Sequence, residues 1–216
     1  MVPFTMRGAL RLLLVTGLAI AAIARAEAPA ATDPHAQHRL MMGAEGKRSV
    51  ASYQAPDVEL VRDDGKTVRF LDELNDGRPV VLTFIYTSCT TVCPLLSHTQ
   101  SQLQSALGAD AARTHLMSVS IDPEQDTPAR LREHARTYHA GPGWQFYTGT
   151  LAASQTVQRA FNVYRGNKMD HSPATLIRLK PGSDWIRFDG FATAEQLRAE
   201  LADFKNGELT ARQVGP

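Results

Sequence analysis

The chain has 216 residues, two cysteines, seven histidines and a formal net charge of +1. This length fits one sizeable domain, and the near-neutral charge gives no support to nucleic-acid binding. No internal repeat is visible, which excludes repeat architectures.

The first 26 residues have the pattern of a secretory signal peptide. Arg7 and Arg11 flank the start of an apolar run over residues 12–24, and Ala24-Arg25-Ala26 offers a cleavage site with small residues. An uncleaved membrane anchor is the alternative, although spanning a bilayer takes about 20 apolar residues. Cleavage would remove three arginines and no acidic residue, which changes the net charge from +1 to −2. We therefore predict an exported protein, which associates with the membrane only if this segment is retained.

Residues 27–55 are rich in alanine, proline, histidine and charged residues and lack apolar periodicity. We predict a flexible tail or linker. The tail contains His35, His38, Met41 and Met42, whose imidazole and thioether groups are copper ligands. It is either an auxiliary copper-capture site or a tail with incidental histidines and methionines.

The globular domain is predicted to span residues 56–206, followed by a C-terminal tail over residues 207–216. The predicted elements, in chain order, are a β-hairpin over 57–61 and 67–70, a central strand over 80–86, a helix that ends at Gly108, a strand over 116–121, a helix capped by Thr127, a strand over 144–147, a helix through Phe161, a hairpin over 175–179 and 185–188, and a last helix with a capping box of Thr193 and Gln196. Strands that alternate with helices favour a parallel core, and the late hairpin adds an antiparallel edge. The predicted fold class is α/β, a thioredoxin-like fold with an additional N-terminal β-hairpin.

Both cysteines lie at one predicted strand-to-helix junction. The strand over 80–86 lacks strict alternation, as strands buried on both faces do, and Pro94 suits the first turn of a helix. Ligands of open α/β sheets bind beyond the carboxyl ends of the strands. A disulfide between Cys89 and Cys93 would remove only about 2 kcal/mol of unfolded-chain entropy. Since a helix N-terminus also lowers the pKa of a thiol, the junction favours redox or metal chemistry over a structural bridge.

The cysteine pair alone does not complete a metal site. Structural zinc sites take four protein ligands, usually several of them cysteines, and this chain has no third cysteine. Two thiolates with one imidazole suit copper, as Cu(I) or Cu(II). His171 is the candidate imidazole, because the loop that contains it is expected to face the cysteine loop; an ordinary loop histidine is the alternative. His134, on a predicted helix, is expected to have a surface role.

Three segments resemble, in order and spacing, the signatures of the Sco (SenC/PrrC) family. They are Thr87 to Pro94, Ser120 to Pro128 and Asp170 to Ser172. The resemblance covers about residues 57–204. Thr90 stands where the family often has proline.

This resemblance implies a thioredoxin-like copper chaperone that is exported to the periplasm, free or anchored in the inner membrane. Cys89, Cys93 and His171 would bind copper, and the two cysteines would also be a redox pair. The implied partner is the copper-bearing subunit of cytochrome c oxidase, whose binuclear copper centre the protein would help to assemble. A thiol reductant and other copper carriers are further expected partners. Asp122 is expected near the ligands, without an assigned role.

The alternative function is a periplasmic thiol-disulfide oxidoreductase without a copper-delivery role. Three residues separate the two cysteines, where the thioredoxin redox motif has two, which weakens that interpretation. A thiol peroxidase is disfavoured because no proline lies between Val80 and Thr87. A passive interaction module has no support beyond the fold. We therefore predict a metallochaperone rather than an enzyme.

Overall fold

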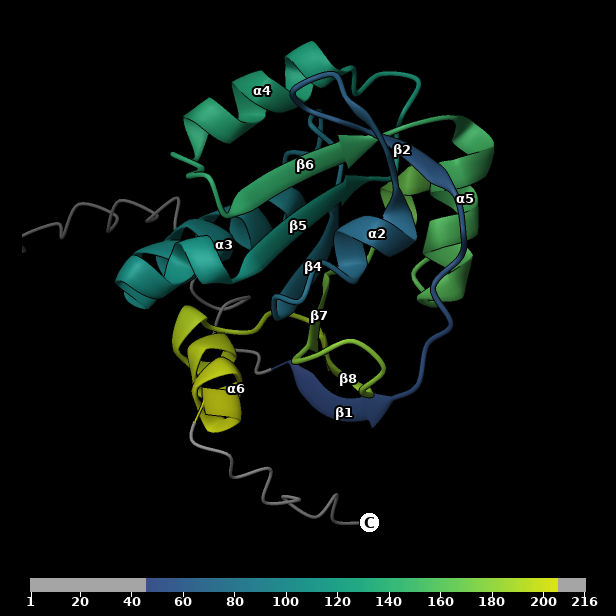
Figure 1. The fold of residues 1–216 in the computed structure, drawn as a ribbon. Coiled ribbons are helices and arrows are strands. Elements are labelled where there is room, and N and C mark those ends of the chain that lie inside the picture. The colour runs from purple at the N-terminus through teal and green to yellow at the C-terminus, as the bar shows by residue number, and fades with distance from the viewer. Residues whose placement is uncertain (1–45, 206–216) are drawn as a thin grey trace, which may run out of the picture. The chain divides into compact units, whose positions relative to one another are not determined.

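The computed structural model describes residues 46–205, which form one mixed sheet with helices on both faces (Figure 1). The strands are β1 (Lys47–Ala51), β2 (Glu59–Arg62), β3 (Thr67–Arg69), β4 (Val80–Ile85), β5 (His115–Ser120), β6 (Trp144–Thr148), β7 (Ala174–Arg178) and β8 (Trp185–Asp189). The helices are α2 (Phe70–Leu74), α3 (Val92–Leu107), α4 (Pro128–Thr137), α5 (Leu151–Ala160) and α6 (Ala194–Lys205), with 3-10 turns η1 (Gly108–Arg113) and η2 (Lys168–Asp170). The eight strands lie in the order β1-β8-β7-β4-β5-β6-β2-β3.

β4 lies in the middle of the sheet, and all six of its residues are buried. It pairs in parallel with β5, where Ile85 is opposite Ser120, and antiparallel with β7, where Thr83 is opposite Thr175. Because β7 runs antiparallel to β4, the start of β7 lies at the end of the sheet where β4 finishes. The loop that enters β7 therefore comes close to the loop that leaves β4.

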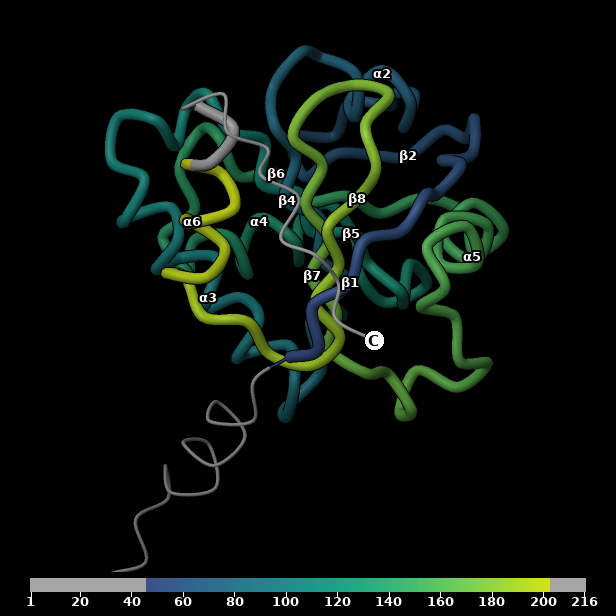
Figure 2. Tube along the Cα trace, turned by 90° about the horizontal axis from the view of Figure 1, so that it is seen from below, coloured from purple at the N-terminus to yellow at the C-terminus, as the bar shows by residue number. Residues whose placement is uncertain are grey.

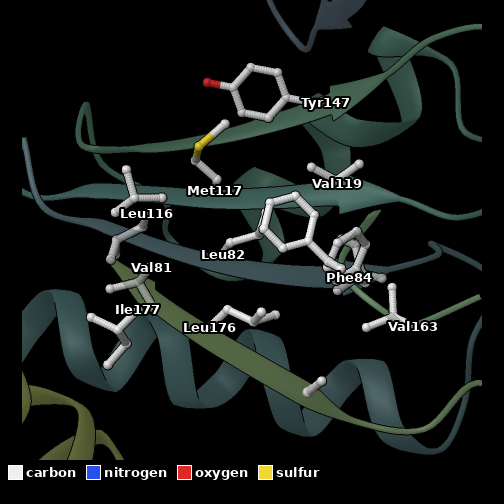
Figure 3. Packing of buried hydrophobic residues seen from close by; sticks show 14 of the residues in the cluster. Val81, Leu82, Phe84, Leu116, Met117, Val119, Tyr147, Val163, Leu176 and Ile177 are labelled. Carbon is white, nitrogen blue, oxygen red and sulfur yellow. The ribbon is translucent and has the colours of Figure 1, made fainter. Parts of the chain in front are cut away.

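Side chains from three adjacent strands make the centre of the core (Figure 3). Val81 and Leu82 of β4, Leu116 of β5, and Leu176 and Ile177 of β7 are all completely buried. Successive residues of a strand point to opposite faces, so β4 contributes apolar side chains to both faces of the sheet. A strand of this composition requires cover on both sides.

The helices supply that cover. Helices α3, α4 and α6 lie on one side of the sheet and α5 on the other (Figure 2). On the α5 side, the ring of Phe161 lies 6.2 Å from that of Phe84 on β4, 6.1 Å from Phe70 on α2 and 5.0 Å from Trp185 on β8. Full burial of a side chain of this kind contributes roughly 1.5–3 kcal/mol relative to exposure. This aromatic cluster fixes one face of the strand that ends at the cysteine loop.

Several predicted elements are confirmed by their ends and pairing. β2 and β3 form the predicted antiparallel hairpin. The Thr127 side chain accepts from the Arg130 N–H at the start of α4, and Thr193 and Gln196 cap α6 reciprocally. Gly108 ends α3 with a φ of 55°. The α/β, thioredoxin-like fold with an N-terminal hairpin is thus the observed architecture.

The predicted flexible tail differs from the structure at its C-terminal end. Residues 47–51 form β1, which pairs antiparallel with β8 from Lys47 opposite Asp189 to Ala51 opposite Trp185. The assignment of these residues to a tail was wrong because β1 is a largely exposed edge strand. β1 is held in place by backbone pairing with β8. Such pairing does not require buried apolar side chains, so the sequence of β1 has no apolar alternation.

Other predictions concern residues beyond the described range. The signal peptide over residues 1–26 and the C-terminal tail over residues 207–216 both lie outside it. Four candidate ligands of the N-terminal tail also lie outside it: His35, His38, Met41 and Met42. Within residues 46–205, no helix has both the length and the apolar character needed to cross a membrane.

Candidate metal centre

Cys89 and Cys93 lie together at the junction between β4 and α3. Cys93 is the second residue of α3, and its backbone N–H donates to the Cys89 Sγ over 3.4 Å. The Thr91 hydroxyl lies 3.8 Å from the same sulfur. Both cysteines are buried and free. The first turn of α3 thus directs its unpaired donors at the Cys89 sulfur.

The two thiols differ in acidity. A hydrogen bond from the Cys93 side chain lowers the pKa of Cys89 to about 4, and the N–H groups of Cys93 and Thr91 add to this effect against the opposing effect of burial. The same interaction with Cys89, together with burial, raises the pKa of Cys93. Cys89 is therefore a thiolate at neutral pH, and Cys93 is the thiol that donates to it.

His171 approaches the junction from the loop that enters β7. The imidazole is only 8% exposed, and its Nε2 lies 2.9 Å from the carbonyl oxygen of Phe84 on β4. A carbonyl oxygen only accepts hydrogen bonds, so Nε2 carries the proton and Nδ1 the lone pair. Nδ1 is buried and has no hydrogen-bond partner within residues 46–205. Burial lowers the pKa of His171, which leaves a neutral imidazole with one unused lone pair.

The three predicted ligands are neighbours but do not converge on one point. In the part of the chain that the structure describes, no three His, Cys, Asp or Glu side chains are close enough to hold a metal ion. Tyr86 adjoins both parts of the site. Its ring centroid is 6.4 Å from that of His171, and burial, followed by the adjacent Cys89 sulfur, raises the pKa of Tyr86 to about 12. The negative charge of Cys89 also acts on His171, where it opposes the effect of burial.

Asp122 supports the histidine loop and does not join the cysteines. Its Oδ2 accepts from the Lys168 Nζ over 2.5 Å, and Lys168 begins the η2 turn that leads into His171. The Asp122 side chain is only 9% exposed, so this ion pair is more strongly held than an ordinary surface pair. Asp122 therefore links the end of β5 to the loop that positions His171.

Asp126 is the site residue that the sequence analysis missed. Its carboxylate is completely buried and accepts from the Thr87 N–H at 3.2 Å, the Thr87 hydroxyl at 2.5 Å and the Ser120 hydroxyl at 2.6 Å. Thr87 lies two residues before Cys89 in the same loop. The only sequence signal is the second aspartate of the segment Ser120 to Pro128, which carries no spacing typical of a ligand. Asp126 positions the cysteine loop from the neighbouring strand end.

Two grooves reach the predicted ligands. One has a volume of about 380 Å³ and is lined by His171, Asp122, Lys168 and residues of α5. The other, of about 460 Å³, is lined by Cys89, Pro94 and residues of α4. Solvent therefore reaches the histidine and the cysteine from different directions.

His134 on α4 lines the groove beside Cys89 and is half-buried, so the expectation of a surface role was wrong. Its Nε2 lies 2.9 Å from the Ser97 hydroxyl on α3, and its ring lies 4.7 Å from that of Tyr138. The apolar stripe of α4 did not reveal this, because the contact is polar and comes from another helix.

The histidines make stability depend on pH. Burial lowers the pKa of His134, as it does for His115 and His171, so these rings are neutral in the fold. The unfolded chain protonates them at a pH of about 6.5. The contribution of these histidines to the free energy of unfolding should therefore be constant above that pH and fall as the pH drops from there toward their folded-state pKa values. Urea unfolding across this range measures the effect.

His134→Gln should reduce the loss of unfolding free energy that the unchanged chain shows as the pH drops below about 6.5. His98 is exposed and bonds to Gln102 on the surface of α3, so His98→Gln is the matched control. It should show the same loss of unfolding free energy at low pH as the unchanged chain. Equal pH profiles for His134→Gln and the unchanged chain would show that burial of His134 makes no contribution.

A comparison with protein-family models matches residues 46–205 to SCO1/SenC. The chain belongs to the SCO1/SenC family. The match covers all of the described residues, including the cysteine junction, Asp122, Asp126 and His171. The resemblance stated from three sequence segments is confirmed at the level of the family.

Individual proteins of the family show the extent of the similarity. A SCO1 protein homolog of Bacillus subtilis (strain 168) is 33% identical over 99 residues, which is 45% of this chain and 50% of that protein. The match therefore spans about half the length of that relative. The structure of Bradyrhizobium japonicum ScoI with copper bound is 26% identical with a TM-score of 0.57, covering 76% of this chain and 99% of the other. BsSco, described as having a disulfide switch and as a member of the Sco family of cytochrome c oxidase assembly proteins, has 20% identity and a TM-score of 0.61, over 74% of this chain and 98% of the other.

Proposed function

We propose that this protein is an exported copper chaperone that binds copper through Cys89, Cys93 and His171. The observation that carries the proposal is the Nδ1 of His171, a buried lone pair without a partner in the described chain, beside a thiol–thiolate pair. Metal-bound histidines usually donate their other N–H to a carbonyl or carboxylate, and Nε2 already does so to Phe84. The ring is thus held in the tautomer that a metal requires.

The donor set favours copper as the cargo. Two cysteine sulfurs and one imidazole match the soft and intermediate ligands that copper takes, whereas structural zinc sites take four protein ligands. Cys89 is already ionised, so binding requires the loss of one proton, from Cys93. Since the three donors do not yet converge, binding also requires the cysteine loop and the histidine loop to approach each other.

The proposed partner is the copper-bearing subunit of cytochrome c oxidase. The description of BsSco as one of the cytochrome c oxidase assembly proteins, and the copper bound to the Bradyrhizobium ScoI, support this assignment. Delivery would take place in the periplasm, in keeping with the predicted leader over residues 1–26. A thiol reductant that keeps the cysteines reduced and other copper carriers complete the proposed set of partners.

The second candidate function is thiol-disulfide exchange, favoured by the unequal acidity of the two cysteines. The Cys89 thiolate would attack one sulfur of a target disulfide and release the other as a thiolate. After losing its proton, Cys93 would attack Cys89, which releases the reduced target and leaves the Cys89–Cys93 disulfide. Two electrons pass to the target, and the same two sulfurs then no longer bind metal.

Copper binding and disulfide formation should therefore exclude each other. Copper needs both sulfurs as thiolates, and oxidation joins them. We expect the reduced protein to bind about one copper per chain when copper and zinc are both offered, and the oxidised protein to bind at least about 100-fold more weakly at this site. Free-thiol titration beside metal analysis, in a graded series of dithiol buffers, measures both states.

Two outcomes would reject this proposal. Equal copper affinity of oxidised and reduced protein would mean that the cysteines are not the ligands. The Cys89–Cys93 disulfide would be structural if it survived conditions that reduce ordinary exposed disulfides. The variant Cys93→Ser, which keeps Cys89 but removes its partner, is the matched control and should neither form the bridge nor retain copper.

A further inference from the structure

Met169 is the most exposed large apolar side chain in the described part of the chain. Its side chain is 71% exposed, against 47% for Val50 and 43% for Leu151. Single exposed apolar residues are common on protein surfaces, so exposure alone assigns no role. The position of Met169 in the fold is what distinguishes it.

Met169 lies in the η2 turn, two residues before His171. Its Sδ is 3.8 Å from the hydroxyl of Tyr86, the residue whose hydroxyl also interacts with the Cys89 sulfur. The backbone N–H of Met169 bonds to the Asn167 side chain at 2.9 Å, which fixes the turn. The thioether is therefore held at the outer side of the residues that surround the candidate centre.

The buried ligands need an accessible intermediary. Cys93 is completely buried, and Cys89 and His171 are each 8% exposed. A copper ion held by another carrier is surrounded by that carrier's own ligands. Cys89, Cys93 and His171 offer such an ion little accessible surface. A thioether that is 71% exposed is accessible to such an ion.

We propose that Met169 is the entry and exit ligand for Cu(I), through which copper passes between partners and the buried centre. This inference rests on the proposed copper-chaperone function. A thioether is a soft donor that selects Cu(I) and has no proton to lose on binding, unlike Cys93. The step is a ligand exchange. A bond between copper and the Met169 Sδ forms as a bond between copper and its carrier breaks. Bonds to the buried ligands then replace the bond to Sδ. Copper remains Cu(I), so no electrons are exchanged.

Met169→Leu tests the proposal, because leucine keeps the apolar volume and removes the sulfur. With the Cu(I)–bicinchoninate complex as the probe and the fully reduced chain as acceptor, we expect the rate of copper uptake to fall by about tenfold or more. The affinity at equilibrium should change by less than about threefold, because Met169 is absent from the final ligand set. The chelator's colour reports both quantities.

A second measurement does not depend on transfer. Chains labelled with ¹³C at the methionine methyl groups should show the Met169 signal shift on addition of less than one equivalent of Ag(I), a redox-inert analogue of Cu(I). Met117 is completely buried in the core and serves as the internal reference. The double variant Met169→Leu/Val50→Met restores an exposed thioether on the edge strand β1, outside the η2 turn, and should remain slow.

The outcomes separate the two proposals. If the unchanged chain and Met169→Leu both retain copper and take it up at the same rate, and the Met169 signal does not move, the role of Met169 is rejected and the chaperone function stands. The role is equally rejected if affinity falls without a change in rate, or if the double variant is as fast as the unchanged chain. If the unchanged chain binds no copper when reduced, both proposals fail.

Discussion

Replacing His171 by alanine should weaken copper binding by more than about 100-fold while leaving both cysteines titratable as free thiols. Changes to groups that only support a metal ligand typically cost about 10- to 100-fold in affinity, and the loss of a ligand should exceed that. Among residues 46–205 the buried Nδ1 has no partner, and Nε2 is engaged by Phe84, so Nδ1 is the atom of the ring that we expect to bind copper. Competition with a Cu(I) chelator gives the affinity, and the thiolate-to-copper absorption of the Cu(II) form reports the ligand set.

His98→Ala is the matched control, because His98 is an exposed histidine on α3 whose partner is the neighbouring Gln102. It should bind copper like the unchanged chain. The assignment of His171 would be wrong if His171→Ala showed the same absorption and affinity as His98→Ala.

Replacing Asp126 by alanine should lower the free energy of unfolding by about 3–5 kcal/mol. The carboxylate accepts from the Thr87 N–H, the Thr87 hydroxyl and the Ser120 hydroxyl, and each donor that is left buried without an acceptor costs about 1–3 kcal/mol. Urea unfolding with an unchanged m-value would show that the loss is one of stability. Copper affinity should fall as well, because Thr87 anchors the loop that contains Cys89.

Asp126→Asn distinguishes the role of the hydrogen bonds from that of the volume. The amide keeps one acceptor oxygen but introduces an N–H₂ group among donors. Asp126→Asn should therefore lower the free energy of unfolding, but by less than Asp126→Ala does. Asp64→Ala, which removes an exposed carboxylate of the β2–β3 turn bonded to Arg62, should cost less than about 1 kcal/mol. A cost for Asp126→Ala no greater than that of Asp64→Ala would contradict the positioning role.

The sequence predicted those parts of the fold that depend on local chemistry. The central strand was visible because β4 is apolar on both faces, and the hairpin and helix ends were visible because Asp-Gly turns, Gly108 and Thr127 act within a few residues. β1 was missed because its pairing with β8 is specified by distant residues. An edge strand with mostly exposed side chains has no pattern to detect.

The sequence named the three proposed ligands but neither their geometry nor the residues that surround them. The motifs nominated Cys89, Cys93 and His171, and sheet polarity placed their loops together. The tautomer of His171 depends on the Phe84 carbonyl, and the acidity of Cys89 depends on the side-chain orientation of Cys93. Asp126 and Met169 were missed for the same reason: their roles come from contacts across strands and loops, which spacing along the chain does not encode.

The order of strands in the sheet also bears on how the chain matures. β7 lies beside β4, yet α3, β5, α4, β6 and α5 separate them along the chain. While the polypeptide is being synthesised, the two cysteines emerge long before the histidine, and the three proposed ligands become neighbours only after β7 has paired with β4. A nascent chain therefore presents two thiols without their imidazole, so it cannot offer the complete proposed copper site. Copper binding by all three proposed ligands would therefore follow the pairing of β7 with β4.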